Sequence, residues 1–184
     1  MTSTANGTPL VRVEYTGIAK FLHWTVAICV LTLIPAGLLM NNVPEGMIQN
    51  TLYTVHRSLG AIVLGLMILR LGYRLIVGWP APEPTITAAQ RIASHAVHNL
   101  LYVLLLAQPA LGWYATSVYG ATVSVFGLFN LPALAEKNEE FSKQLFAVHE
   151  LMGLAIAGLL VMHIGGALFH YFIRRDGVLQ RMLP

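Results

Sequence analysis

Four long apolar stretches divide the chain, and polar or proline-containing segments separate them. A helix needs about 20 residues to cross the hydrocarbon core of a bilayer, and each stretch reaches that length. We predict membrane-spanning helices over residues 18–40, 52–77, 93–118 and 144–173. Pro44, the run at 80–84 and Pro132 fall between them, where helices end. The pattern therefore predicts an all-α protein, a single transmembrane domain over residues 1–184 folded as a membrane-spanning four-helix bundle.

The distribution of Lys and Arg predicts the orientation of these helices. If the N-terminus is inside, eight of the eleven cationic residues lie on the cytoplasmic side, as the positive-inside rule requires. Those eight are Arg12, Lys20, Arg70, Arg74, Arg91, Arg174, Arg175 and Arg181. Both termini are then cytoplasmic. The longest loop, residues 119–143, is periplasmic, and we interpret it either as a cap with a short helix or as a functional lid.

Composition narrows the class of protein. Hydrophobic residues make up 56% of the chain and charged residues only 10%, whereas a soluble domain has about 25% charged residues. The formal charge of +3 comes without a basic cluster, so we predict no nucleic-acid binding. The first apolar stretch is longer than the ~7–15 residues of a signal-peptide core, which predicts a retained signal anchor. Cys29 is the single cysteine, so neither an internal disulfide nor a covalently attached c-type haem is expected.

Seven histidines in so apolar a chain are the most informative feature. An ionisable side chain inside a membrane span is costly and marks a functional site by default. His149 and His163 are 14 residues apart, so they project from nearly the same helix face and lie ~21 Å apart along the axis. His56 matches the depth of His149 near the outer surface, and His23 matches that of His163 near the inner surface. The sequence thus predicts the pairs His56/His149 and His23/His163.

Two histidines on facing helices can occupy both axial positions of one haem iron. A haem ligated in this way has no open site for oxygen, which is typical of electron transfer. We therefore predict two haem b groups, one per pair, that carry electrons across the membrane. A zinc or proton transporter is the alternative, because histidine also serves those roles. Such transporters usually add membrane carboxylates, however, and here only Glu150 is near a span.

Cationic and hydroxyl side chains near these pairs are candidates for binding the anionic haem propionates. Arg57 and Ser58 adjoin His56 and are expected at the outer haem, while Lys20 is expected at the inner one. Arg70 and Arg74 lie one turn apart and are candidates for a propionate or a quinone headgroup. By default, however, we expect the side chains of Arg70 and Arg74 to extend toward lipid phosphates.

Three further histidines and several glycines have less defined roles. His170 lies seven residues beyond His163, where it could donate a proton to a quinone beside the inner haem or meet lipid headgroups. His95 and His98 either reach the inner haem or sit at headgroup level. Small residues near the ligands allow a porphyrin ring or a neighbouring helix to approach. They are Gly60, Gly153, Gly165 and Gly166.

Four segments together resemble the bacterial cytochrome b561 family, the four-helix di-haem type. They are KFLHW around His23, VHRSLGAIVLGLMILRLGYR from Val55, HAVHNLLYVLLLAQPALGWY on the third span and VHELMGLAIAGLLVMHIGGALFHYF from Val148. The resemblance covers nearly the whole chain after its first fifteen residues. It implies a multi-pass protein of the bacterial inner membrane that binds two haem b groups and exchanges electrons with quinone. The implied iron ligands are His23, His56, His149 and His163.

One branch of that family is a superoxide oxidase, which implies electron transfer from periplasmic superoxide to ubiquinone, with His170 near the quinone. The outer side of this chain has five acidic residues beside Arg57, Lys137 and Lys143, so another periplasmic donor stays open. The alternative is a haem b anchor subunit that links a separate dehydrogenase or hydrogenase to the quinone pool. The short loops favour the self-contained oxidoreductase. Membrane lipid is an expected partner, and a homodimer is possible.

Overall fold

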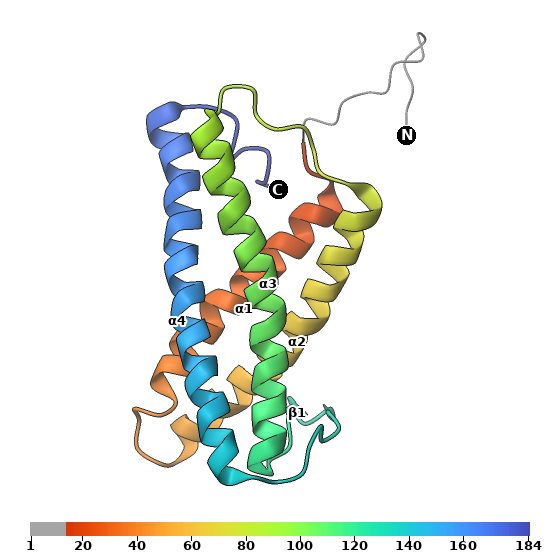
Figure 1. Cartoon of the computed structure of the whole chain (residues 1–184), viewed down its shortest axis with the longest axis vertical. Coiled ribbons are helices and arrows are strands. Elements are labelled where there is room, and N and C mark those ends of the chain that lie inside the picture. The colour runs from red at the N-terminus through yellow and green to blue at the C-terminus, as the bar shows by residue number, and fades with distance from the viewer. Residues whose placement is uncertain (1–13) are drawn as a thin grey trace.

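The computed structural model describes residues 14–184 and contains four long helices. They are α1 (Gly17–Leu39), α2 (Met47–Val77), α3 (Ala88–Tyr119) and α4 (Glu139–Phe169), and a short π-helix, η1 (His170–Arg174), continues α4 (Figure 1). All four long helices have the length and apolar composition needed to cross a membrane. The predicted all-α class and the four predicted spans are confirmed.

Three helices begin five residues earlier than the apolar stretches predicted, namely α2, α3 and α4. Polar caps explain the earlier starts of α3 and α4. Thr87 and Gln90 form a reciprocal capping box, in which the Thr87 hydroxyl accepts from the Gln90 backbone N–H at 3.2 Å. Asn138 accepts from the backbone N–H of Phe141 at 3.0 Å. Such caps satisfy free N–H groups and extend a helix beyond its apolar part.

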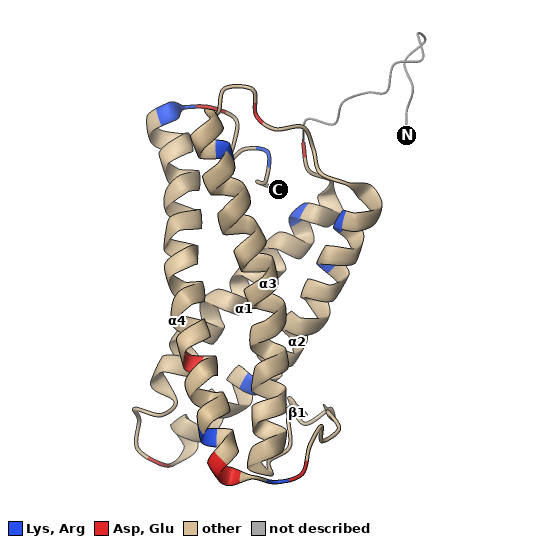
Figure 2. Cartoon of the chain, in the orientation of Figure 1, with Lys and Arg blue, Asp and Glu red and all other residues tan. Residues whose placement is uncertain are grey.

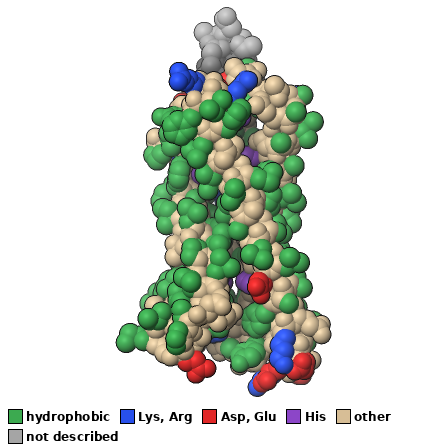
Figure 3. Space-filling model, turned by 90° about the vertical axis from the view of Figure 1, so that its left-hand side faces the viewer, with side chains coloured by type: hydrophobic (Ala, Val, Ile, Leu, Met, Phe, Trp, Pro, Cys, Tyr) green, Lys and Arg blue, Asp and Glu red, His purple; other side chains and the backbone are tan. Residues whose placement is uncertain are grey.

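The helices pack in the order of the sequence, which leaves one side of the bundle open. α1 lies along α2, α2 along α3 and α3 along α4, whereas α1 and α4 have no comparable line of close backbone contact. Figure 3, which views the molecule from the side of α4, shows a hollow running between columns of apolar side chains, with histidines visible inside it. We call this open side the α1–α4 seam.

A small apolar core joins all four helices. It consists of Val26, Val30, Val63, Met67, Leu101 and Ile156. Many other large apolar side chains are exposed, such as Ile76 at 87%, and they cover the outside of the bundle (Figure 3). An apolar exterior around a modest core is the arrangement expected for helices surrounded by lipid.

The start of α1 and the C-terminus lie at the same end of the bundle (Figure 1). The final segment is held there, because the Trp24 indole N–H donates to the carbonyl of Met182 at 2.9 Å. Seven of the ten described Lys and Arg residues are at this end, and five of the eight acidic residues are at the other (Figure 2). Arg12, also counted in the predicted orientation, lies outside the described residues. We call these the inner and outer ends, after the predicted orientation.

The outer loop contains a β-hairpin, and the prediction of a short helix in this loop is wrong. Strands β1 (Ser124–Val125) and β2 (Phe129–Asn130) pair antiparallel. The hairpin is attached to α2 through the fully buried hydroxyl of Ser58, which accepts from the Phe126 N–H at 2.9 Å and donates to the Ser124 carbonyl at 3.2 Å. Gly120, with φ of 90°, ends α3 in the left-handed conformation that glycine adopts readily. The loop is therefore a cap fixed by a helix side chain.

The Ser58 attachment gives a stability prediction. Replacement by alanine (Ser58→Ala) leaves the Phe126 N–H without its acceptor, which we expect to lower the free energy of unfolding by about 1–3 kcal/mol. Thermal unfolding of the purified protein in detergent measures the effect. Thr32→Ala is the control, because it removes an exposed hydroxyl that bonds only within its own helix, to the carbonyl of Ile28. Equal melting temperatures for the two variants would contradict the assigned role of Ser58.

Candidate functional site

The structure brings four of the histidines together as two pairs at two depths. The rings of His23 on α1 and His163 on α4 have centres 6.0 Å apart, with an angle of 75° between their planes. The rings of His56 on α2 and His149 on α4 have centres 6.1 Å apart, at 73°. These are the pairs that the sequence predicts. α4 contributes to both because two heptads bring a helix back to nearly the same face.

The spacing of both pairs fits coordination of one metal ion by two imidazoles. A metal–imidazole bond is about 2 Å long, and the ring centre lies about 1 Å beyond the nitrogen. Two imidazoles on opposite sides of one ion therefore have centres about 6 Å apart, as both pairs do. The residues present fit the haem iron that the sequence predicts.

A large cavity adjoins the outer pair. Its volume is about 1420 Å³, and its walls include His56, His149, Gly60 and Gly153. Small-molecule sites usually have about 300–1,000 Å³, so this cavity has room for a group as large as a porphyrin. Arg57, Lys143 and Glu150 also line it. The cavity thus combines an apolar interior with charged groups of both signs.

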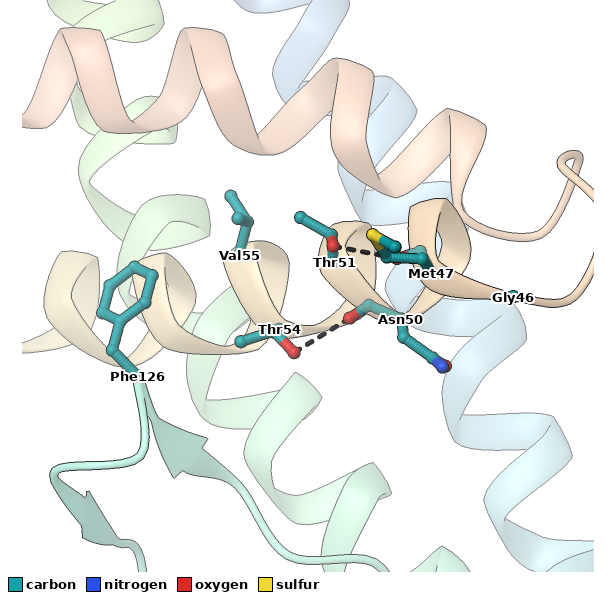
Figure 4. A pocket seen from close by; sticks show the side chains of 7 residues that line it. All are labelled: Gly46, Met47, Asn50, Thr51, Thr54, Val55 and Phe126. Atoms are coloured by element: carbon teal, nitrogen blue, oxygen red, sulfur yellow. Dashed lines mark hydrogen bonds between the residues drawn. The ribbon is translucent and has the colours of Figure 1, made fainter.

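A shallower depression of about 690 Å³ lies beside the first turns of α2 and Phe126 of the hairpin (Figure 4). Its threonine hydroxyls are tied to the helix, since Thr51 donates to the carbonyl of Met47 and Thr54 to that of Asn50, both at 2.8 Å. No charged side chain lines it. Asn50 and Thr54 also line the large cavity, so the depression extends the mouth of that cavity.

Two glycines that the sequence analysis missed make room for the outer imidazoles. A Cβ on Gly37 of α1 would lie 2.8 Å from Cε1 of His56, and one on Gly112 of α3 would lie 2.8 Å from Cε1 of His149. Neither distance is tolerable, so any larger residue would displace a ring. These glycines are distant from the histidines in sequence. The one sequence signal for them is that each is expected at the same membrane depth as the histidine it contacts.

The glycines singled out from the sequence behave differently. No heavy atom of another residue lies within 4 Å of a Cβ built on Gly60, Gly165 or Gly166. Close helix packing therefore does not require them, while approach of a flat ring stays a prediction. A Cβ on Gly153 would lie 3.3 Å from Nε2 of Gln108. This glycine makes room for a polar side chain of α3.

Hydrogen bonds at Nδ1 show which ring nitrogen is free to bind a metal. Nδ1 of His56 lies 3.0 Å from the carbonyl oxygen of Leu33. A carbonyl only accepts, so Nδ1 donates and Nε2 keeps its lone pair for a metal. At the inner pair, Nδ1 of His23 lies 2.8 Å from Nη1 of Arg70. Arginine only donates, so the neutral ring carries its proton on Nε2. Metal binding through Nε2 of His23 thus requires Arg70 to leave Nδ1.

Arg70 and Arg74 both point into the bundle, and the default expectation that they extend to lipid phosphate is wrong. Arg70 also donates from Nε to the Tyr102 hydroxyl at 3.1 Å. Arg74 is buried, with its guanidinium 4.3 Å from the ring centre of Tyr15. Two cations beside the inner histidines create a site that suits an anionic group.

The other propionate candidates have contacts of their own. Lys20 lies 4.0 Å from the carboxylate of Glu14. Arg57 stacks over Tyr53 at 5.1 Å and faces the cavity. The hydroxyl of Ser58 is fully buried and bonded to the hairpin backbone. Lys20 and Arg57 are half-buried, and their role toward a propionate stays a prediction.

His98 lies beside the inner pair, although His98 and His95 are both exposed side chains. The His98 ring centre is 5.0 Å from that of His163, at 90°. Nδ1 of His98 donates to the carbonyl of Ser94 at 2.6 Å, so its Nε2 is an acceptor. His98 therefore reaches the inner pair, and the position of His95 at headgroup level stays a prediction.

His170 is paired with an acidic residue that the sequence analysis missed. Its Nδ1 lies 2.6 Å from Oδ2 of Asp176, and the two side chains are only 12% and 6% exposed. His170 begins the π-helical turn η1, whose wider winding is frequent at functional sites. The carboxylate fixes the ring through Nδ1. The sequence does contain a signal for this pair, namely an acidic residue just past the end of a membrane helix and six residues after a histidine.

Residues 14–184 contain no group of three or more His, Cys, Asp or Glu side chains arranged to hold a metal ion. Zinc sites in proteins have three or four such ligands. The described part of the chain therefore offers no zinc centre of the kind that the transporter alternative needs.

Comparison with known proteins identifies relatives over almost the whole chain. A family model described as prokaryotic cytochrome b561 matches residues 14–184. Two Escherichia coli K12 proteins, named cytochrome b561 homolog 2 and homolog 1, are similar. The first is 32% identical over 172 residues, covering 92% of this chain and 91% of the relative. The second is 31% identical over 165 residues, covering 89% and 93%.

A further relative carries a more specific name. The chain is 27% identical over 177 residues to a Yersinia pestis protein named probable superoxide oxidase CybB. The match covers 93% of this chain and 96% of the relative.

The glycine at the outer pair yields a prediction on cofactor content. In Gly112→Ala the new methyl group displaces the ring of His149, so we expect haem per chain to fall from the predicted two toward one. A pyridine haemochrome assay measures it. Gly158→Ala on α4 is the matched control, because no heavy atom lies within 4 Å of its added Cβ. If both variants keep the same haem content, Gly112 is not needed for the outer site.

Proposed function

The chain belongs to the prokaryotic cytochrome b561 family of membrane haem proteins, and we propose that it passes electrons across the membrane from superoxide on the outer side to a quinone at the inner end. The observation that carries this proposal is the stacking of two imidazole pairs along α4, with ring centres 6.0 and 6.1 Å apart. The relative named probable superoxide oxidase supports the choice of donor.

In this proposal His56 and His149 hold one haem b at the outer end, and His23 and His163 hold a second at the inner end. Ring spacing and the 1420 Å³ cavity support the assignment. Bound haem would supply a one-electron relay between the two depths. Two histidines bound to each iron would leave no coordination position for oxygen.

Cationic side chains would neutralise the propionates. Arg70 lies at the inner pair, and its move from Nδ1 of His23 to a propionate would free that imidazole for ligation. Lys20 is one turn from His23 and is the second inner candidate. Arg57 faces the outer cavity. Charge-assisted bonds from arginine to carboxylate are strong and geometrically specific, which favours Arg70 and Arg57.

The outer cavity suits a small anionic donor. Arg57, Lys143 and Glu150 line it. Because Lys143 is paired with Glu140 at 2.6 Å, Arg57 is the lining cation that would attract superoxide, and Glu150 offsets part of that attraction. Each superoxide anion gives up one electron and leaves as dioxygen. Two such electrons and two protons convert quinone to quinol. The predicted positive-inside orientation, with both chain ends in the cytoplasm, puts the donor in the periplasm.

His170 is proposed as the proton donor to the quinone. It lies at the inner end, one heptad beyond His163, and Asp176 holds its Nδ1 at 2.6 Å. Because the carboxylate accepts from Nδ1, Nε2 can donate to the quinone oxygen only from a ring that carries a proton on both nitrogens. Nε of Arg174 lies 3.9 Å from the same carboxylate.

The proposal is tested with purified protein, a steady enzymatic source of superoxide and a soluble ubiquinone analogue. We expect two haem b per chain and quinone reduction that superoxide dismutase abolishes. His149→Ala should retain one haem per chain and lose the activity. Protein without haem, or His149→Ala with both haems, would overturn the ligand assignment. Two haems without superoxide-dependent reduction, together with a co-purifying dehydrogenase, would favour the anchor-subunit alternative.

The quinone site gives a second prediction. His170→Gln should slow quinone reduction by about 10²-fold, because general acid catalysis typically contributes that much. Asp176→Asn should give a smaller loss in the same direction, since the ring keeps a partner but loses its carboxylate. Superoxide-driven haem reduction should be unchanged in both variants. His95→Gln, an exposed histidine at the same end, is the control. Slowed haem reduction in His170→Gln would contradict a role limited to the quinone.

A further inference from the structure

The turn of the outer β-hairpin, residues 126–129, carries large apolar side chains that are exposed, and we call it the hairpin tip. Phe126 is 46% exposed, Leu128 81% and Phe129 57%. The sequence around the tip is also uncharged, since residues 120–135 contain no Lys, Arg, His, Asp or Glu. A contiguous apolar patch of this kind marks an interaction surface.

The hairpin lies beside the bundle rather than beyond its end. It is bonded to Ser58, which is 11 residues past Met47, the first residue of α2, or ~16 Å along the helix axis. A second attachment comes from α3, where the Trp113 indole N–H donates to the carbonyl of Pro132 at 2.9 Å. Figure 1 shows the hairpin turned back along the helices. The tip is therefore held at the level of the outer turns of the membrane-spanning helices.

The apolar exterior of α2 continues onto the tip. Met47 and Ile48, in the first turn of α2, are exposed large apolar side chains. Met47 lines the same shallow depression as Phe126 of the tip (Figure 4). Lipid surrounds the apolar exterior of a membrane-spanning bundle, so the patch on the tip belongs to a surface that already faces lipid on α2.

The backbone of the tip makes hydrogen bonds within the protein. The Phe126 N–H donates to the Ser58 hydroxyl at 2.9 Å, and the Leu128 N–H closes the turn by donating to the carbonyl of Val125 at 2.9 Å. The apolar part of a bilayer offers no hydrogen-bond partners, so a segment that enters it must satisfy its backbone internally. These bonds suit apolar surroundings.

The turn also holds an apolar residue at a strained position. Phe126 has a φ of 49° and is followed by Gly127 with a φ of 74°. Two successive positive φ values favour Asn, Asp or Gly, and a bulky residue is an outlier there. A polar residue would relieve the strain, yet the chain presents a phenyl ring at this place.

We propose that the hairpin tip is an interfacial anchor, which inserts Leu128 and Phe129 at the boundary between the headgroups and acyl chains of the phospholipids at the outer end. Phospholipid is the occupant because the tip lies at the level of the spans, continues the apolar face of α2 and lacks charged groups that a soluble partner could recognise. Aromatic and aliphatic side chains are typical of such boundary contacts. This anchor goes beyond the proposed function and does not depend on the electron donor or acceptor.

The anchor has a consequence for the outer cavity. Phe126 borders the depression that extends the mouth of that cavity. If the tip lies at the lipid boundary, the mouth opens at the membrane surface.

Spin labels on the full-length protein, reconstituted in phosphatidylcholine and phosphatidylglycerol vesicles, test the proposal. The label is attached to Leu128→Cys in a Cys29→Ala background, which removes the native thiol. Collisions with oxygen, which concentrates in lipid, are compared with collisions with a water-soluble nickel complex. The matched control is Glu136→Cys, an exposed position in the charged part of the same loop. We expect the ratio of oxygen to nickel collisions to be several-fold higher at Leu128→Cys than at Glu136→Cys.

Two results would overturn the anchor. Nickel collisions as frequent at Leu128→Cys as at Glu136→Cys would place the tip in water. Few collisions with either reagent, together with dipolar broadening between labels, would assign the tip to a contact between two copies of the chain. Phe129→Cys repeats the measurement at a second tip residue and decides alone if Leu128→Cys does not fold.

Discussion

Two imidazoles on one face of α4, 14 residues apart, are the constraint on which the rest of the molecule depends. They fix two layers, one near each end of the bundle, and every other helix is arranged to serve them. α1 and α2 each supply one partner ring, at 6.0 and 6.1 Å. α1 and α3 supply the glycines that make room for the outer rings. The apolar core lies where all four helices meet.

The two layers differ in the groups that contact Nδ1 of the histidine rings. At the outer layer, Nδ1 of His56 donates to the neutral backbone carbonyl of Leu33. At the inner layer, the guanidinium of Arg70 occupies Nδ1 of His23, and Arg74 is buried nearby. The two histidine pairs therefore experience different electrostatic environments. A protein can direct electrons one way by this asymmetry without any change of ligand.

Hydrophobic length and histidine spacing are sufficient to predict the four spans and the pairing of the rings, because both follow from helix periodicity and depth. They cannot predict features that depend on contacts distant in sequence. The hairpin held by Ser58 needs a hydroxyl and a loop 66 residues apart to meet. Asp176 becomes a partner of His170 only because η1 ends and the chain turns back.

The α1–α4 seam has a consequence for assembly. Each helix packs against the one before it in the sequence, so the chain can complete its helix contacts in the order of synthesis while the seam stays open. A flat, largely apolar prosthetic group in the bilayer could then enter laterally between α1 and α4. A haem held by His23 of α1 and His163 of α4 would then bridge the seam. In this protein the cofactor would be the last part of the bundle to be added.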